Sequence, residues 1–80
     1  MDRNSIRSQI QDILRDILDN QSIIINEKTT STEVKGWDSL IHIQLIVAIE
    51  NHFGMKFSSI EIIQAKNIKE LVNIVYQKIM

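Results

Sequence analysis

Apolar residues recur every three or four positions along much of the chain, and this spacing constrains the fold more than any other feature. Near the start, the positions concerned are Ile6, Ile10, Ile13, Leu14, Ile17 and Leu18. This is the i, i+4, i+7, i+8, i+11 pattern of one helical face, with polar residues on the other side. We therefore predict a first helix over residues 5–19, with Asn20 as its C-terminal stop.

Residues 38–53 form a second helical stretch that is apolar over more than half of its circumference, so this helix should be the central one. Asp38 can cap its first turn, because a carboxylate there accepts hydrogen bonds from free backbone N–H groups. Gly54 stands where a left-handed residue closes a last turn. We expect the ring of Phe53, just before it, to close the core.

Two further signals complete the helical pattern. The run from Ser58 to Glu61 has the spacing of a capping box and predicts a short third helix over residues 59–65. A similar signature predicts a fourth helix over residues 67–79, with its buried stripe at Ile68, Leu71, Val72, Val75 and Ile79. No Pro interrupts these helices. The predicted fold is a single all-α domain, residues 1–80, built as a four-helix bundle.

The connection between the first two helices, residues 20–37, has no helical period and is long for a compact domain. Its apolar anchors are the run Ile23–Ile25 and the pair Val34 and Trp37. No second strand is present to pair with the isoleucine run, so we expect extended chain across the helix ends. The polar segment 26–32 should move on a fast timescale, since it cannot bury enough apolar area to offset the entropy of ordering.

Composition excludes several classes of function. The chain has 80 residues and a net charge of -1, so it is too short for a multi-step enzyme and lacks the basic stripe that would bind nucleic acid. With no Cys and two His, we expect no disulfide framework and no metal site. No segment reaches the roughly 18 apolar residues of a membrane span. We expect a discrete, monomeric, cytoplasmic protein without a signal segment.

The run from Gly36 to Leu40 places a serine, Ser39, at the first helical position after the long connection. The simplest interpretation is that Asp38 caps the helix and Ser39 merely tolerates the first turn. A functional interpretation starts from electrostatics. A phosphate ester at Ser39 would lie in the favourable field of a helix N-terminus, and an exposed hydroxyl there can be reached by a modifying enzyme.

The chain resembles an acyl carrier protein over nearly its whole length. Ser39 within Asp38-Ser39-Leu40 matches the family's attachment site for 4'-phosphopantetheine, at the start of the second of four helices. The resemblance implies that a phosphopantetheinyl transferase moves the arm from coenzyme A to the Ser39 hydroxyl. Asp38 would help that enzyme place its metal and coenzyme A. Acyl groups would then be carried as thioesters on the arm's thiol by a protein that is not itself an enzyme. The carrier needs no Cys of its own, because the reactive sulfur comes with the cofactor.

Two residue choices depart from the commonest pattern of that family. Trp37 stands where fatty-acid carriers usually have a small residue, and we expect it to pack rather than to contact substrate. Residues 38–53 contain only Asp38 and Glu50 as acids, so electrostatic steering to basic partners should be weak. We therefore expect a specialised carrier for acyl-loading and acyl-transferring enzymes. Its predicted docking residues are Leu40, Ile41, Gln44 and Val47, with Ile41 and Val47 pointing outward.

His42, one turn after Ser39, could suggest a Ser-His hydrolase. The Gly-flanked strand-to-helix elbow that exposes such a serine is missing, which argues against this activity. In a carrier, His42 would be a rim contact for partner enzymes or a solvent-facing residue. Two alternatives stay open at this point. One is an aminoacyl or hydroxyacyl carrier for peptide, polyketide or surface-polysaccharide synthesis, and the other is a helical interaction module without a prosthetic group.

Overall fold

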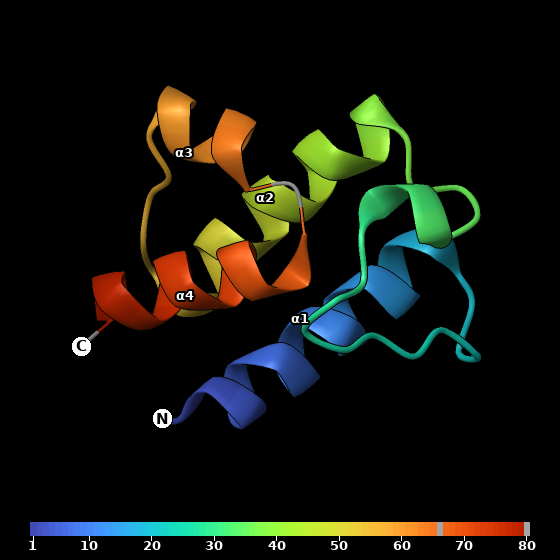
Figure 1. Cartoon of the computed structure of the whole chain (residues 1–80), viewed down its shortest axis with the longest axis horizontal. Helices are drawn as coiled ribbons and strands as arrows, with labels where there is room; N and C mark the ends of the chain where they lie inside the picture. Colours follow the sequence, from blue (N-terminus) through green and yellow to red (C-terminus); the bar gives the residue numbers. More distant parts are fainter. Residues whose placement is uncertain (66, 80) are drawn as a thin grey trace.

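A computed structural model describes residues 1–65 and 67–79 of the chain. Within these residues it has four α-helices, α1 (Arg3–Leu18), α2 (Ser39–Phe53), α3 (Ser59–Gln64) and α4 (Ile68–Ile79), and a short 3-10 turn, η1 (Ser31–Glu33). In Figure 1 the long first connection occupies the right side of the molecule, while α3 and α4 lie on the left. The predicted all-α, four-helix fold is confirmed. None of the described helices has the length and apolar character needed to cross a membrane.

The core is organised around α1 and not around α2. The side chains of Ile6, Ile10 and Leu14 on α1 are completely buried, and α1 packs against both α2 and α4. The residues that α2 contributes to the core are Leu45, Ile46 and Ile49. The expectation that α2 is the central helix is therefore wrong, because part of its apolar surface faces solvent.

The bounds of α1 differ from the predicted 5–19 at both ends. The helix begins at Arg3, because the Asp2 carboxylate accepts a hydrogen bond from the backbone N–H of Ser5 at 2.8 Å and so caps the first turn. It ends at Leu18, because Asp19 adopts a left-handed conformation with φ of 49°. Asp19, rather than Asn20, is therefore the stop. The other three helices lie within one residue of their predicted bounds.

The first connection is anchored at more points than the sequence indicates. Ile23 and Ile25 are buried as expected, and Ile24 between them points outward. In the polar segment, however, Thr29 is also buried, and its carbonyl accepts a hydrogen bond from the backbone N–H of Ile68 at 3.0 Å. The start of α4 therefore supplies an anchor within segment 26–32 that its composition did not indicate, while the fast motion expected of this segment stays a prediction.

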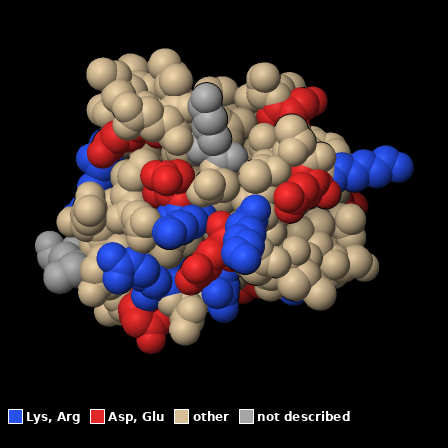
Figure 2. Space-filling view, viewed as in Figure 1, with Lys and Arg blue, Asp and Glu red and all other residues tan. Residues whose placement is uncertain are grey.

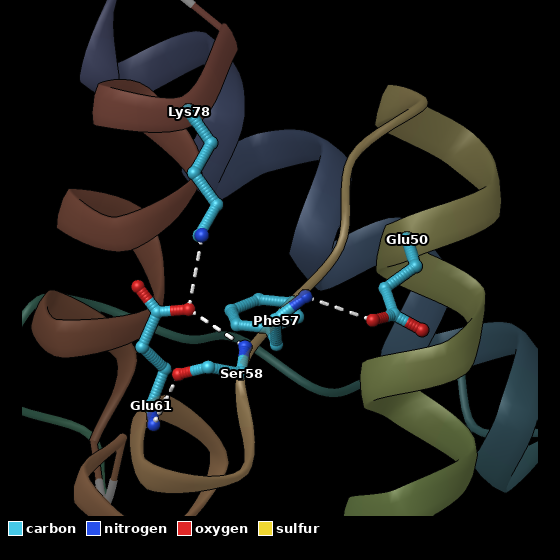
Figure 3. A network of polar contacts seen from close by, with 5 residues as sticks. All are labelled: Glu50, Phe57, Ser58, Glu61 and Lys78. Atoms are coloured by element: carbon cyan, nitrogen blue, oxygen red, sulfur yellow. Dashed lines mark hydrogen bonds and ion pairs between the residues drawn. The ribbon is translucent and has the colours of Figure 1, made fainter.

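A polar network holds α3 between α2 and α4 (Figure 3). The Glu50 carboxylate on α2 accepts the backbone N–H of Phe57 at 2.8 Å. The predicted capping box is present: the Ser58 hydroxyl accepts the N–H of Glu61 at 3.2 Å, and the Glu61 carboxylate accepts the N–H of Ser58 at 2.8 Å. Lys78 of α4 approaches Glu61 to 3.0 Å. The Ser58 N–H first, and then Lys78, lower the pKa of the Glu61 carboxyl below its usual value.

The aromatic ring that completes the core belongs to Phe57 rather than to Phe53. Phe57 is buried, whereas Phe53 is only partly buried at the edge of the core, with the ring of His52 against it at a centroid distance of 4.8 Å. The chain turns at Gly54, which has φ of 66° and closes α2 as predicted. The expectation that Phe53 closes the core is therefore wrong, because the buried ring is that of Phe57, the next aromatic residue along the chain.

This difference in burial predicts the order of two stability losses. Phe57→Ala should lower the free energy of unfolding by about 3–5 kcal/mol, the usual cost of emptying a buried phenylalanine site. Phe53→Ala, a chemically identical change at a partly exposed site, should cost less. Urea denaturation of the two variants beside the wild type measures both values. A larger loss for Phe53→Ala would contradict the assignment of the core.

Candidate functional site

Ser39 is the first residue of α2, and its side chain is exposed. Asp38 is the N-cap: its carboxylate accepts the backbone N–H of Ile41 at 2.9 Å, and its carbonyl accepts the N–H of His42 at 2.9 Å. The first N–H groups of the helix have no intrahelical partner and give this end a partial positive charge. A hydroxyl at this position is therefore accessible and lies in a field that favours an attached anion.

The chain just before α2 is fixed by the burial of Trp37. Only 6% of this residue is exposed, and its backbone N–H donates to the carbonyl of Val34 at 3.1 Å. Gly36 has φ of 91°, a left-handed conformation in which a side chain is strained. A Cβ at Gly36 would also lie 3.3 Å from the side chain of Leu18 on α1. The close approach of this turn to α1 therefore sets the position at which α2 begins.

An open pocket of about 720 Å³ lies beside Ser39. Hydroxyl side chains line it on the side of the first connection, namely Thr30, Ser31 and Thr32. Apolar side chains line it on the side of α2 and α3, namely Ile43, Ile62 and Ile63. Its volume falls within the range of about 300–1,000 Å³ that is typical of small-molecule sites. A flexible group attached at Ser39 would have both hydrogen-bonding and apolar walls beside it, so these residues fit a phosphorylated arm with amide groups.

His42 lines the same pocket and is paired with Trp37. The indole Nε1–H donates to His42 Nδ1 at 3.3 Å, and the two rings are 6.0 Å apart between centroids and 22° from parallel. The hydrogen bond of His42 thus goes to the indole, not to Ser39, which gives no support to a Ser-His hydrolase. Sequence reasoning missed this pair, because residues 37 and 42 belong to different elements and no periodic pattern connects them.

The predicted docking residues do not all face solvent. Leu40 and Val47 are 66% and 48% exposed, and Gln44 is exposed as well. Ile41, in contrast, is partly buried and packs against the core, so the expectation that it points outward is wrong. Ile43 was not predicted as a docking residue but is 51% exposed. The spacing i, i+3, i+7 of residues 40, 43 and 47 is the signal that could have identified it.

Residues 38–53 contain two acidic side chains, those of the N-cap Asp38 and of Glu50 on α2, and both accept internal hydrogen bonds. Asp38 accepts the N–H of Ile41, and Glu50 accepts the N–H of Phe57. The exposed surface of α2 includes a row of three apolar side chains, Leu40, Ile43 and Val47, which we call the apolar face of α2. Figure 2 shows most of the basic side chains of this view in its lower part, while acidic side chains lie both there and at the upper left and upper right.

Comparisons with known proteins found a family model and a solved structure that match this chain. Residues 8–75 match a family model described as phosphopantetheine attachment site. The fold is similar to the solution NMR structure of a holo acyl carrier protein from Geobacter metallireducens, with a TM-score of 0.84 and 33% sequence identity. That similarity covers 90% of this chain and 83% of the other. A search of curated proteins found no match.

The cap at the start of α2 predicts a measurable stability effect. Asp38→Ala should lower the free energy of unfolding by about 0.5–2 kcal/mol, because the N–H of Ile41 loses its acceptor. Asp38→Asn is the matched control, since an amide oxygen caps a helix about as well as a carboxylate. Thermal and urea denaturation compare the three proteins. Equal losses for Ala and Asn would show that the charge, and not the cap, stabilises this end.

Proposed function

Because the chain belongs to the acyl carrier protein family, we propose that Ser39 is the residue to which its 4'-phosphopantetheine arm is attached. Members of this family are carriers and not enzymes, and their cofactor is bound covalently. The observation that carries the assignment is the exposed Ser39 hydroxyl at the capped start of α2, on the rim of the pocket. A phosphopantetheinyl transferase and acyl-handling enzymes are the partners of such a carrier.

Each residue at the site then has a defined task. The free N–H groups of α2 stabilise the negative charge of the phosphodiester at Ser39. Asp38 keeps the first turn formed and, being exposed, is available to the transferase for placing its metal and coenzyme A. The arm supplies the thiol on which an acyl group is carried as a thioester, because the chain has no Cys of its own.

We also infer that the carrier serves a specialised pathway. The support is the apolar face of α2, together with the presence of only two acids, Asp38 and Glu50, within residues 38–53. A surface of this kind offers little long-range attraction to a basic partner and more apolar area for contact at short range. Partner enzymes with an apolar entrance surface are therefore favoured over those that attract an acidic carrier.

Intact mass spectrometry tests the attachment site. After incubation with coenzyme A and a broad-specificity phosphopantetheinyl transferase, the wild type should gain the mass of one arm and Ser39→Ala should gain none. Ser31→Ala is the matched control, because Ser31 lines the same pocket but begins the three-residue turn η1 and not an α-helix. Modification of the Ser39→Ala variant would refute the assignment. An unmodified wild type would favour an interaction module without a prosthetic group.

The docking mode predicts a response to salt and to one substitution. Loading by the cognate enzyme should change little as added salt shortens the screening length from about 10 Å at 0.1 M to about 3 Å at 1 M. Ile43→Glu should slow loading by about tenfold or more, because it places a charge in an apolar contact, an effect of at least about 1.4 kcal/mol. Ile24→Glu, at an exposed isoleucine of the first connection, should leave the rate unchanged.

A housekeeping fatty-acid carrier serves as the reference in the same assay. Its loading should fall steeply with salt, and general fatty-acid synthase enzymes should load it much faster than they load this protein. Efficient loading of this protein by those enzymes, with a steep salt dependence, would contradict the specialised assignment.

A further inference from the structure

The pair formed by Trp37 and His42 lies directly beside the proposed attachment site. Ser39 and His42 are three residues apart on α2, a spacing that puts their Cβ atoms about 5–6 Å apart on one face of a helix. Both residues line the pocket. The imidazole is therefore within reach of a group bonded to the Ser39 hydroxyl.

Trp37 determines which nitrogen of His42 carries the proton. An indole N–H can only donate, so His42 Nδ1 must act as the acceptor across their 3.3 Å contact. In the neutral imidazole the proton then lies on Nε2, which becomes a donor. Since Trp37 is buried, its N–H needs a partner whether or not the arm is present, so this arrangement exists before the arm arrives.

The chemistry of the other lining residues leaves few alternatives to this donor. Of the described residues that line the pocket, none is a Lys or an Arg. One hydroxyl of the pair Thr30 and Thr32 donates to the other at 2.9 Å, Ser31 offers a further hydroxyl, and the Asp38 carboxylate is an acceptor. A phosphodiester has only acceptor oxygens on the phosphorus. Among the described side chains that line the pocket, the nitrogen donors are the indole N–H of Trp37, which is in use, and the Nε2–H of His42.

We propose that His42, oriented by Trp37, is a positioning residue whose Nε2–H donates to the phosphodiester of the arm on Ser39. This inference rests on the proposed attachment of the arm to Ser39. The hydrogen bond adds a side-chain donor to the N–H groups of α2 and holds the first bonds of the arm on the side of the pocket. Trp37 therefore has a second role beyond packing, because it selects the imidazole tautomer that can donate.

Nuclear magnetic resonance of the holo protein tests this pair without an activity assay. Long-range ¹H–¹⁵N spectra should show His42 as the Nε2–H tautomer in both the apo and the holo protein. Trp37→Phe keeps an aromatic ring but removes the indole donor, and it should give a mixture of tautomers. A predominant Nδ1–H tautomer in the wild type would overturn the proposal without the use of any variant.

The ³¹P resonance of the arm reports on the hydrogen bond itself. His42→Ala should shift this resonance, while His42→Gln, whose amide can still donate, should return it toward the wild-type position. His52→Ala is the matched control at the other end of α2 and should leave it in place. Backbone ¹H–¹⁵N spectra verify that each variant is folded. A ³¹P resonance that is identical in wild type and His42→Ala would overturn this inference alone, whereas a wild type that acquires no arm would overturn the proposed function as well.

Discussion

The burial of Trp37 is the constraint on which the functional end of the molecule depends. A buried indole cannot leave its place without exposing a large apolar surface, so the chain on either side of it has little freedom. On one side, Gly36 passes so close to Leu18 of α1 that a Cβ would press on that side chain. On the other side, α2 must begin at once, with Asp38 as cap and Ser39 in the first turn. Core packing around α1 thus determines where an exposed hydroxyl meets a helix N-terminus.

The features that could be predicted from the sequence are those whose physical cause is local. The caps by Asp38, Gly54 and Ser58 each involve partners within about one helical turn, and all three are found as predicted. The Asp2 cap was missed because it precedes the first apolar position of α1. The carbonyl of buried Thr29 pairs with the backbone N–H of Ile68, far along the chain, so local composition indicated a loose segment where the fold provides an anchor.

The candidate site was only partly predictable, for the same reason. The place of Ser39 follows from local capping signals, whereas the pocket requires the first connection, α2 and α3 to meet in space. Apolar periodicity also failed to separate two stripes on α2. Ile41 belongs to the core side, and Ile43 belongs to the exposed face. Because both stripes have helical spacing, only the packed structure shows which residues a partner can touch.

The walls of the pocket differ in what supports them, and this difference comes from the length of the elements. The wall formed by the first connection is held by buried Trp37 and Thr29, so moving it would disturb the core. The wall formed by α3 belongs to a helix of six residues, far shorter than the roughly 12–15 residues at which an isolated helix is even marginal.

Helix α3 therefore depends on its ends and on its neighbours. The buried residues that flank it, Phe57 and Ala65, fix its two ends, and the capping box supplies partners for its first N–H groups. The ion pair between Glu61 and Lys78 lies at the surface with both side chains partly exposed, and it adds only about 0–1 kcal/mol. Burial of Trp37 and Thr29 thus anchors one wall and the start of α2, while buried flanking residues and hydrogen bonds at the ends of a short helix hold the other wall. The hydroxyl of Ser39 lies on the side anchored by Trp37.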